Sequence, residues 1–405
     1  MQREQAAEDI VIAGLAVALG LHRKGVRSVV LESSPTLRTS GFAFMTWTNA
    51  FRALDALGVG DKMRSQHQQI QGLRVMSSAT GEIMQELDLR VQGKRGPHEA
   101  RCVSRNELLR ALEEELPTGT IRYSSKIVST EEDGNANILH LSDGSTFRAK
   151  VLIGCDGINS VVARWLGLAK PSDSGRTATR GHAKYPEGHG FEPKFLQLVG
   201  KGFRAGLVPC NDADVYWFFT WSPSPDAAMK QFVLTKLRST KVPPQVLEAI
   251  ERSEMNDVLA APLRFRSPLS LLFTSSISKG NVCVAGDALH PTTPDLAQGA
   301  CTALEDAVVL ARCLGEALLR TGGDGAAAEE ERSRRVEAGL RQYADSRRWR
   351  SVQLTGASYV VGFVQQSDHA AVGFLRDKLM STVLAKMVLM MPDYDCGTLS
   401  SSGAC

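Results

Sequence analysis

The sequence lacks the features that mark several protein classes. Its eight cysteines include no C-x-x-C pair, and no cluster of His, Cys or carboxylate residues has the spacing of metal ligands, so no metal is expected. Lys and Arg form no long run and the net charge is only +3, which gives no case for a nucleic-acid partner. Neither a secretory signal nor an apolar run of about 18 residues is visible. We therefore expect a soluble protein of a reducing compartment, cytoplasmic or plastid, with no membrane span.

The length and composition predict a globular protein with more than one core. At 405 residues the chain exceeds what a single hydrophobic core usually supports. Hydrophobic residues make up 43% and charged residues 22%, as in ordinary soluble proteins. Two domains, or one domain with a large insertion, are expected, and nothing in the sequence indicates the oligomeric state.

The start of the chain has the pattern of a strand–helix–strand unit. Residues 9–12 form a short β-branched run, residues 15–24 suit a helix, and Gly25 stands where a helix commonly ends. Residues 28–32 then have the pattern of a second buried strand. Such a unit implies a parallel sheet with a right-handed crossover.

Later segments predict a second kind of sheet and a helical end. Asp143-Gly144 marks a hairpin turn, and residues 195–221 alternate as in an antiparallel sheet inserted into the first domain. Residues 281–285 return to a buried parallel strand, and residues 303–319 suit a helix. We expect residues 322–335 to form a flexible link into a helical tail.

Two further expectations concern apolar side chains. Aromatic residues of the inserted sheet are more often sheet core than ligand contacts, and they are Phe203, Tyr216, Trp217, Phe219 and Trp221. Residues 379–391 are too short to cross a bilayer and contain Lys386. We expect this segment to pack on the body as an apolar helix, and peripheral contact with a membrane is the alternative.

Two strand ends carry candidate cofactor ligands. Glu32 ends the second strand, where a carboxylate accepts hydrogen bonds from ribose hydroxyls in dinucleotide-binding folds; the alternative is a solvated glutamate. Asp156 and Gly157 follow another strand, in a turn whose backbone can lie against a cofactor and whose Ser160 can cap the next helix. The alternative there is a plain turn with a capping aspartate.

The stretch GDALHP at residues 286–291 is the most informative. Asp287 follows a buried strand, and Gly286 lets a ligand chain approach the backbone, which suits binding of a ribityl hydroxyl. Pro294, Gln298 and Gly299 lead into a helix whose N-terminus carries positive partial charge. We interpret His290 as a turn histidine.

These motifs together resemble the class A flavin-dependent monooxygenases, the family of para-hydroxybenzoate and salicylate hydroxylases. The resemblance rests on Glu32, on Arg105 in SRNELLRAL, on CDGINS at 155–160 and on GDALHPTTPDLAQGACTALEDA at 286–307. It runs from about residue 8 to residue 399, and the ending at 393–397 is similar to plant salicylate-hydroxylase-like members. It implies an α/β fold, with a Rossmann-like FAD-binding domain, an inserted antiparallel β-sheet substrate domain and a helical C-terminal tail.

The resemblance also implies cofactors and a site. The enzyme would bind FAD and use NAD(P)H and O2 to hydroxylate a small aromatic or lipophilic molecule, and the flavin would supply the redox chemistry. The residues expected to bind the cofactor are Gly14, Glu32, Arg105, Asp156, Gly157, Gly286, Asp287, Pro294, Gln298 and Gly299. No catalytic side chain is indicated.

The same comparison suggests the domain boundaries. The FAD-binding domain would comprise residues 8–75, 98–180 and 275–320. The substrate domain would comprise residues 76–97 and 181–274, and the C-terminal helical region residues 321–405.

One part of the family pattern is shortened in this chain. In the family the first strand runs into a Gly-x-Gly-x-x-Gly loop that holds the pyrophosphate. Gly14 aligns with the third glycine, and about five residues containing the first two are absent. The loss of two hydrogen bonds to the charged pyrophosphate would weaken FAD binding by about 3 to 6 kcal/mol. Ala297 and Ala300 also stand at positions that are often glycine in the plant members of the family. An impaired paralogue or splice form with weak FAD binding is therefore the alternative function, and a flavin oxidoreductase without oxygen insertion is a third.

Overall fold

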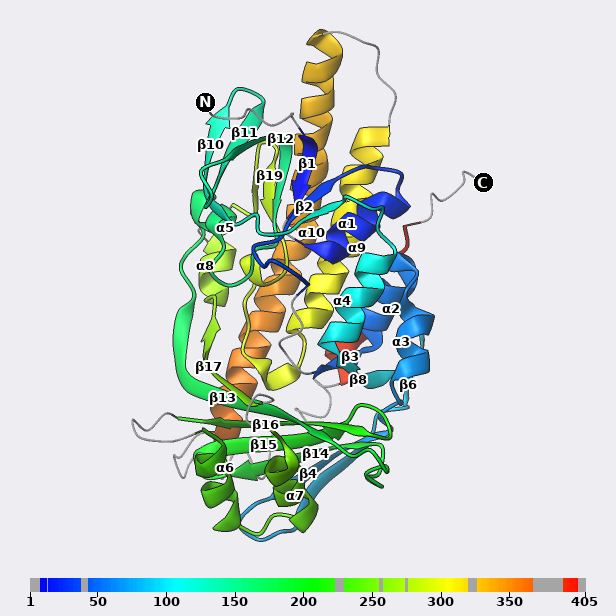
Figure 1. Ribbon diagram of the computed structural model, residues 1–405, viewed down its shortest axis with the longest axis vertical. Helices are drawn as coiled ribbons and strands as arrows, with labels where there is room; N and C mark the ends of the chain where they lie inside the picture. Colours follow the sequence, from blue (N-terminus) through cyan, green and yellow to red (C-terminus); the bar gives the residue numbers. More distant parts are fainter. Residues whose placement is uncertain are drawn as a thin grey trace.

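Two β-sheets and a set of long helices make up the structure. The computed structural model describes residues 8–12, 14–37, 43–222, 229–254, 258–273, 276–319, 326–366 and 389–399. Figure 1 shows the two sheets toward opposite ends of an elongated molecule, with helix α10 (Ala326–Gln366) running from one toward the other.

The first sheet is built around parallel strands. Its main path runs β10-β11-β12-β1-β2-β9, and β19 pairs with β12. Val11 lies opposite Leu152 on one side and Val29 on the other, in parallel register. The strands are β1 (Glu8–Ile12), β2 (Val29–Leu31), β9 (Ile121–Arg122), β10 (Ile127–Asp133), β11 (Ala136–Leu141), β12 (Thr146–Gly154), β18 (Ser278–Lys279) and β19 (Val282–Val284).

The second sheet is antiparallel except where β14 pairs with β4. Its order is β17-β13-β16-β15-β14-β4-β5. Helices α6 (Met229–Arg238) and α7 (Pro244–Arg252) contribute to a separate apolar cluster with this sheet. The strands are β4 (Gly72–Ser77), β5 (Ile83–Asp88), β13 (Ser172–Lys184), β14 (Lys194–Gly200), β15 (Phe203–Pro209), β16 (Asp214–Trp221) and β17 (Val258–Phe265).

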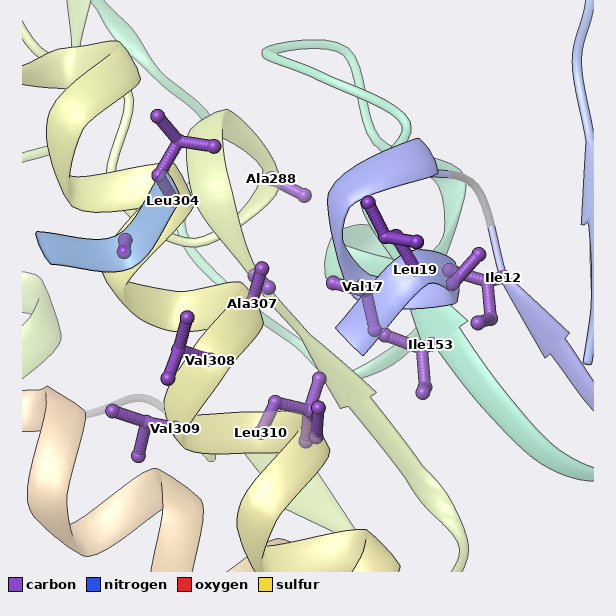
Figure 2. Close-up of a cluster of buried hydrophobic side chains, with 14 of the residues drawn as sticks. Ile12, Val17, Leu19, Ile153, Ala288, Leu304, Ala307, Val308, Val309 and Leu310 are labelled. Carbon is purple, nitrogen blue, oxygen red and sulfur yellow. The ribbon is translucent and has the colours of Figure 1, made fainter. Parts of the chain in front are cut away.

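The main core joins the first sheet to its helices. Gly20 of α1 (Leu15–Arg23) has no side chain, and a Cβ there would lie 2.7 Å from the Cβ of Ala311 in α9 (Gly299–Leu319). This glycine therefore lets the two helices pack closely. In Figure 2 Val17, Leu19, Ile153 and Leu310 belong to the same buried cluster. Other elements are α2 (Thr48–Leu57), α3 (Gly60–Gln66), α4 (Arg105–Glu114), α5 (Val161–Trp165), α8 (Pro268–Phe273), β3 (Ala43–Trp47), β6 (Gln92–Gly93), β7 (Gly96–Pro97) and β8 (Ala100–Ser104).

Most elements expected from the sequence are present. The unit β1-α1-β2 is parallel, Gly144 has the left-handed φ of +83° in the hairpin between β11 and β12, and β19 is parallel to β12. The link expected at 322–335 is wrong from Ala326 onward, because α10 begins there. Residues 322–325 lie outside the described part, as do residues 379–388 of the expected apolar helix.

The domain ranges stay a prediction. The second sheet takes in all of β4 and β13, so it begins somewhat before the expected ranges 76–97 and 181–274. Among the helices that the structure describes, none combines the length and the apolar character needed to cross a membrane.

Candidate cofactor and substrate site

A cavity of about 920 Å³ lies where the first sheet, α9 and the second sheet meet. Gly14 and Cys155 line it after β1 and β12, and Asp287 lines it after β19. Ligands of parallel α/β sheets bind beyond these carboxyl ends of strands. The volume lies near the upper end of the usual range for small-molecule sites, about 300–1,000 Å³. It therefore suits a large ligand, or a cofactor together with a substrate.

The Asp287 carboxylate is the negative charge most directly offered to this cavity. It has neither a hydrogen bond nor an ion pair with any residue that the structure describes. The side chain is exposed to the cavity, yet the surrounding protein atoms raise the pKa of its carboxyl by desolvation, and the positive charges of His290, Arg105 and Arg180 oppose this effect. The side chain is exposed on the cavity wall, so its carboxylate oxygens can accept hydrogen bonds from a ligand. Ribityl hydroxyls of a flavin would supply them, so this end of the cavity fits FAD.

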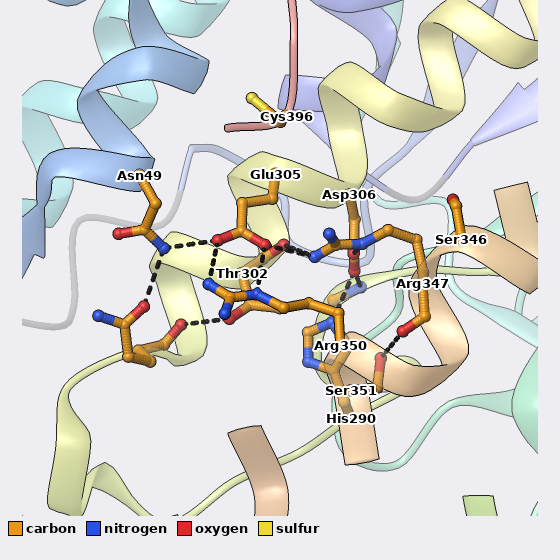
Figure 3. Close-up of polar contacts among 12 residues, drawn as sticks. Asn49, His290, Thr302, Glu305, Asp306, Ser346, Arg347, Arg350, Ser351 and Cys396 are labelled. Carbon is orange, nitrogen blue, oxygen red and sulfur yellow. Dashed lines mark hydrogen bonds and ion pairs between the residues drawn. The ribbon is translucent and has the colours of Figure 1, made fainter. Parts of the chain in front are cut away.

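A buried ionic network holds the turn that carries Asp287. Asp306 of α9 accepts the N–H of Gly286 at 2.8 Å, and Nε2 of His290 lies 2.6 Å from the same carboxylate oxygen. The other oxygen accepts Nε–H of Arg347 at 2.6 Å (Figure 3). Burial alone would raise the pKa of Asp306, but the charges of His290 and Arg347 lower it to about 2. His290 thus has a structural role, as the sequence indicated.

Glu305 extends this network toward the start of α9. It accepts hydrogen bonds from Arg347 at 2.7 Å, from Arg350 at 2.8 Å and from Asn49 at 2.6 Å. Asn49 also donates to the side chain of Gln298 at 2.9 Å. Gln298 therefore supports the start of α9 through its side chain, and it is not part of the cavity lining.

The N-terminus of α9 opens onto the cavity. Pro294 of η3 (Pro294–Leu296) and Gly299 both line it. The first N–H groups of a helix have no partner within the helix, so they present positive partial charge there. Ala297 has a φ of +52°, a conformation that favours glycine. The alanine that replaces a frequent glycine at position 297 therefore has to adopt a backbone conformation that glycine adopts more easily.

The remaining predicted ligands divide between the cavity and the framework. Gly14, Arg105 and Gly157 line the cavity, as does Gly286. Glu32 directly follows β2, is half-buried, and accepts the N–H of Ser34 at 2.8 Å. It is not among the cavity-lining residues. A part for Glu32 in cofactor binding stays a prediction.

Asp156 acts as a helix cap in this structure. One carboxylate oxygen accepts the hydroxyl of Ser160 at 2.5 Å, and the other accepts the N–H of Val161 at 2.6 Å. Ser160 in turn accepts the N–H of Ala163 at 2.8 Å, which confirms its expected capping role. Both oxygens of Asp156 are thus engaged at the start of α5, and its expected contact with cofactor stays a prediction.

The second sheet adds arginines and rings that sequence reasoning missed. Arg204 lines the cavity, donates to Asp295 at 3.3 Å and lies over the ring of Phe218 with 5.2 Å to its centre. Arg180 on β13 also lines the cavity. It has neither a hydrogen bond nor an ion pair within the described residues. For Arg204 the signal in the sequence was a single cation within an apolar strand, whereas β13 contains several charged residues and did not single out Arg180.

The aromatic residues of this sheet face two ways. Phe203, Trp217 and Phe219 belong to the apolar cluster that includes α6 and α7, and so does Trp221. Tyr216 lines the cavity, and burial raises its pKa to about 12. Four of the five aromatic side chains are therefore sheet core, as expected, and one is a candidate ligand contact.

Known proteins resemble this chain over most of its length. A family model described as FAD binding domain matches residues 12–342. Monooxygenase 2 of Arabidopsis thaliana is 44% identical over 98% of this chain and 99% of its own length, and Monooxygenase 1 of that plant is 35% identical over 96% and 97%.

Solved structures share the fold. Klebsiella pneumoniae HpxO complexed with FAD and uric acid superposes with a TM-score of 0.79 at 22% identity, covering 95% of this chain and 96% of that one. A salicylate hydroxylase substrate complex gives 0.74 at 20% identity, covering 96% of each chain. These likenesses confirm the α/β fold class expected from the sequence. The chain therefore belongs to the class A FAD-dependent monooxygenases.

Proposed function

We propose that this chain uses NAD(P)H and O2 to hydroxylate a small aromatic molecule that carries an acidic group. The observation that supports it is the composition of the cavity, whose lining includes Asp287 after β19 of the first sheet and Arg180, Arg204 and Tyr216 of the second sheet. Bound FAD supplies the transfer of electrons from the nicotinamide and of one oxygen atom to the substrate. The protein supplies binding, orientation and a cavity with largely apolar walls.

In this proposal the residues that follow β19 and those at the start of α9 hold the flavin. Asp287 accepts hydrogen bonds from ribityl hydroxyls, and Pro294 and Gly299 bring the positive end of α9 toward the flavin ring. That end favours the negative charge of the reduced ring. Apolar side chains around it exclude water, which protects reactive species from side reactions.

Arg180 is the group on which the substrate class depends. Its guanidinium is half-buried, lines the cavity and has neither a hydrogen bond nor an ion pair among the described residues. Arg204 lies on the same sheet, with β16 between its strand and that of Arg180, and it donates a hydrogen bond to Asp295. A carboxylate or phenolate would satisfy such a guanidinium. The ring of the substrate would then lie against Tyr216 and Phe218.

The test combines turnover with oxygen labelling. NADH and NADPH oxidation is measured with hydroxybenzoates, neutral phenols and indoles, and products formed under ¹⁸O2 are analysed by mass spectrometry. Label in the product supports a monooxygenase. Substrate-dependent NAD(P)H oxidation that never places label in any product would contradict it and favour the oxidoreductase alternative.

Arg180→Gln and Arg180→Lys separate the substrate class from the reaction. Removing a hydrogen bond to a charged group costs about 1.5–3 kcal/mol, so Arg180→Gln raises KM for acidic substrates about 10- to 100-fold. Neutral substrates keep their KM, and Arg180→Lys retains part of the affinity. An equal rise in KM for acidic and neutral substrates would refute the assignment of an acidic group.

A further inference from the structure

The connection between β1 and α1 is too short to hold a pyrophosphate. The strand ends at Ile12 and the helix begins at Leu15, so two residues join them. A Cβ on Gly14 would lie 2.8 Å from the Cβ of Cys155 at the end of β12. Gly14 therefore does what the third glycine of Gly-x-Gly-x-x-Gly does, which is to let the helix pack on the strand.

The positions of the other two glycines are inside the strand. By the spacing of the motif they fall at Asp9 and Val11. Val11 is fully buried and pairs with strands on both sides. Asp9 forms ion pairs with Lys150 and Arg332, at 3.4 and 3.3 Å. Neither residue lines the cavity, so neither offers its backbone to a phosphate there.

Apolar side chains face the cavity after this connection. Leu15, Ala16 and Val17 line it, in the first turn of a helix whose N-cap Gly14 provides no side-chain hydrogen bond. Among the cavity-lining residues that the structure describes, that helix N-terminus and Arg105 from the start of α4 are the groups at this end that can bind an anion. No described residue at this end therefore takes the place of the first two glycines of the phosphate loop.

At the other end of the same cavity, around Asp287 and Gly299, the residues suited to hold the ribityl chain and the flavin ring are present. Asp287 and Gly299 both line the cavity and lie close together, since a Cβ on Gly299 would be 4.0 Å from Oδ1 of Asp287, an ordinary van der Waals distance. The network of Asp306, His290 and Arg347 fixes the turn below it. The two ends of the site therefore differ in how well they fit FAD.

We propose that this chain recognises its flavin by the ring and the ribityl chain, with little contribution from the pyrophosphate and the adenosine. FAD, FMN and riboflavin then bind with dissociation constants within about tenfold of one another. This inference rests on the proposed flavin chemistry but concerns binding alone. It also defines the ligand class as flavins in general, whether or not they carry the adenosine half.

Flavin titration of the apoprotein tests the inference. The quenching of flavin fluorescence gives dissociation constants for FAD, FMN and riboflavin in the natural chain. A second protein carries Val-Gly-Ala-Gly-Ile between Ile12 and Ala13, which restores Gly-x-Gly-x-x-Gly ending at Gly14. A third carries Val-Ala-Ala-Ala-Ile there, and so adds the same length without the glycines.

The expected result is a change in the ratio of affinities. The glycine insertion raises the preference for FAD over riboflavin by about 10²- to 10⁴-fold, and the alanine insertion does so much less. Binding of FAD more than about tenfold tighter than riboflavin by the natural chain overturns the inference, whichever way the insertions fold, and leaves the proposed function standing. If none of the three flavins binds any of the proteins, the proposed function fails along with it.

Discussion

At the scale of single residues, Ala297 holds an unfavourable backbone conformation beside the flavin end of the cavity. Its φ of +52° costs an L-residue about 1–2 kcal/mol relative to an ordinary conformation, and glycine avoids that cost. Glycine also gives the unfolded chain more freedom, which offsets about 0.4–1 kcal/mol. We expect Ala297→Gly to raise the free energy of unfolding of the apoprotein by about 0.5–1 kcal/mol in urea titrations.

A matched control stands three residues further on. Ala300 also lines the cavity, but it lies in the regular first turn of α9. Ala300→Gly therefore lowers the free energy of unfolding, by up to about 1 kcal/mol. If both glycine variants lost stability, strain at Ala297 would not be the explanation for the backbone there.

The sequence predicted where a site residue lies when that residue directly follows a buried strand. Asp287 and Gly286 follow a buried strand, and the structure brings both to the cavity. Arg347 and Arg350 were missed because they lie in a helix about 40 residues beyond their partner Glu305. Two adjacent acidic residues within an apolar helix were the available signal, since buried carboxylates require partners.

At the scale of elements, two strand-to-helix turns carry aspartates with opposite surroundings. Asp287 after β19 has no partner among the described residues, whereas Asp156 after β12 caps α5 with both oxygens. Asp287→Ala is expected to weaken flavin binding about 10- to 100-fold without loss of apoprotein stability. Asp156→Ala is expected to lower the free energy of unfolding by about 1–2 kcal/mol.

Two measurements on each variant distinguish the roles. Flavin fluorescence quenching gives the affinity, and urea unfolding of the apoprotein gives the stability. Loss of flavin affinity in Asp156→Ala at unchanged stability would instead support the cofactor role predicted for it. Unchanged affinity in Asp287→Ala would remove the main argument for where the ribityl chain lies.

Element types followed from local pattern, but some boundaries did not. The hairpin at Asp143-Gly144 and the unit β1-α1-β2 depend on near neighbours, and both were predicted. The Gly- and Ala-rich stretch before Arg335 suggested a linker, yet α10 already includes it from Ala326. Alanine and glutamate favour helix, and composition alone underestimated that preference.

At the scale of the whole molecule, the cavity depends on contacts that local pattern does not encode. Arg180 and Arg204 reach it from the second sheet, whereas Asp287 reaches it from the first. The order of strands in each sheet, and the way the sheets meet, decide which side chains face one another. For this reason the cavity-lining residues near Asp287 were predictable from motifs, and those of the second sheet required the structure.

The last prediction concerns stability in acid, and it compares two aspartates with the same pKa. Asp306 is buried and Asp88 is exposed, yet both have a pKa lowered from 3.8 to about 2. For Asp306, burial opposes the shift and the charges of His290 and Arg347 cause it. For Asp88, hydrogen bonds from Arg90 cause it.

Because the folded pKa of Asp306 is the lower one, its carboxylate stabilises the fold above the unfolded pKa of about 3.8, and this stability is lost as the pH falls toward 2. For buried Asp306 the shift corresponds to about 2 kcal/mol. Asp306→Asn leaves buried cations unpaired, which costs about 3–5 kcal/mol at neutral pH. Its deficit relative to the natural chain should shrink by about 1 kcal/mol between pH 5 and pH 3 in urea titrations. Asp88→Asn should leave the free energy of unfolding nearly unchanged at both values, because water and salt screen an exposed pair. A deficit for Asp306→Asn that stayed constant with pH would mean that the buried network does not depend on the charge of Asp306.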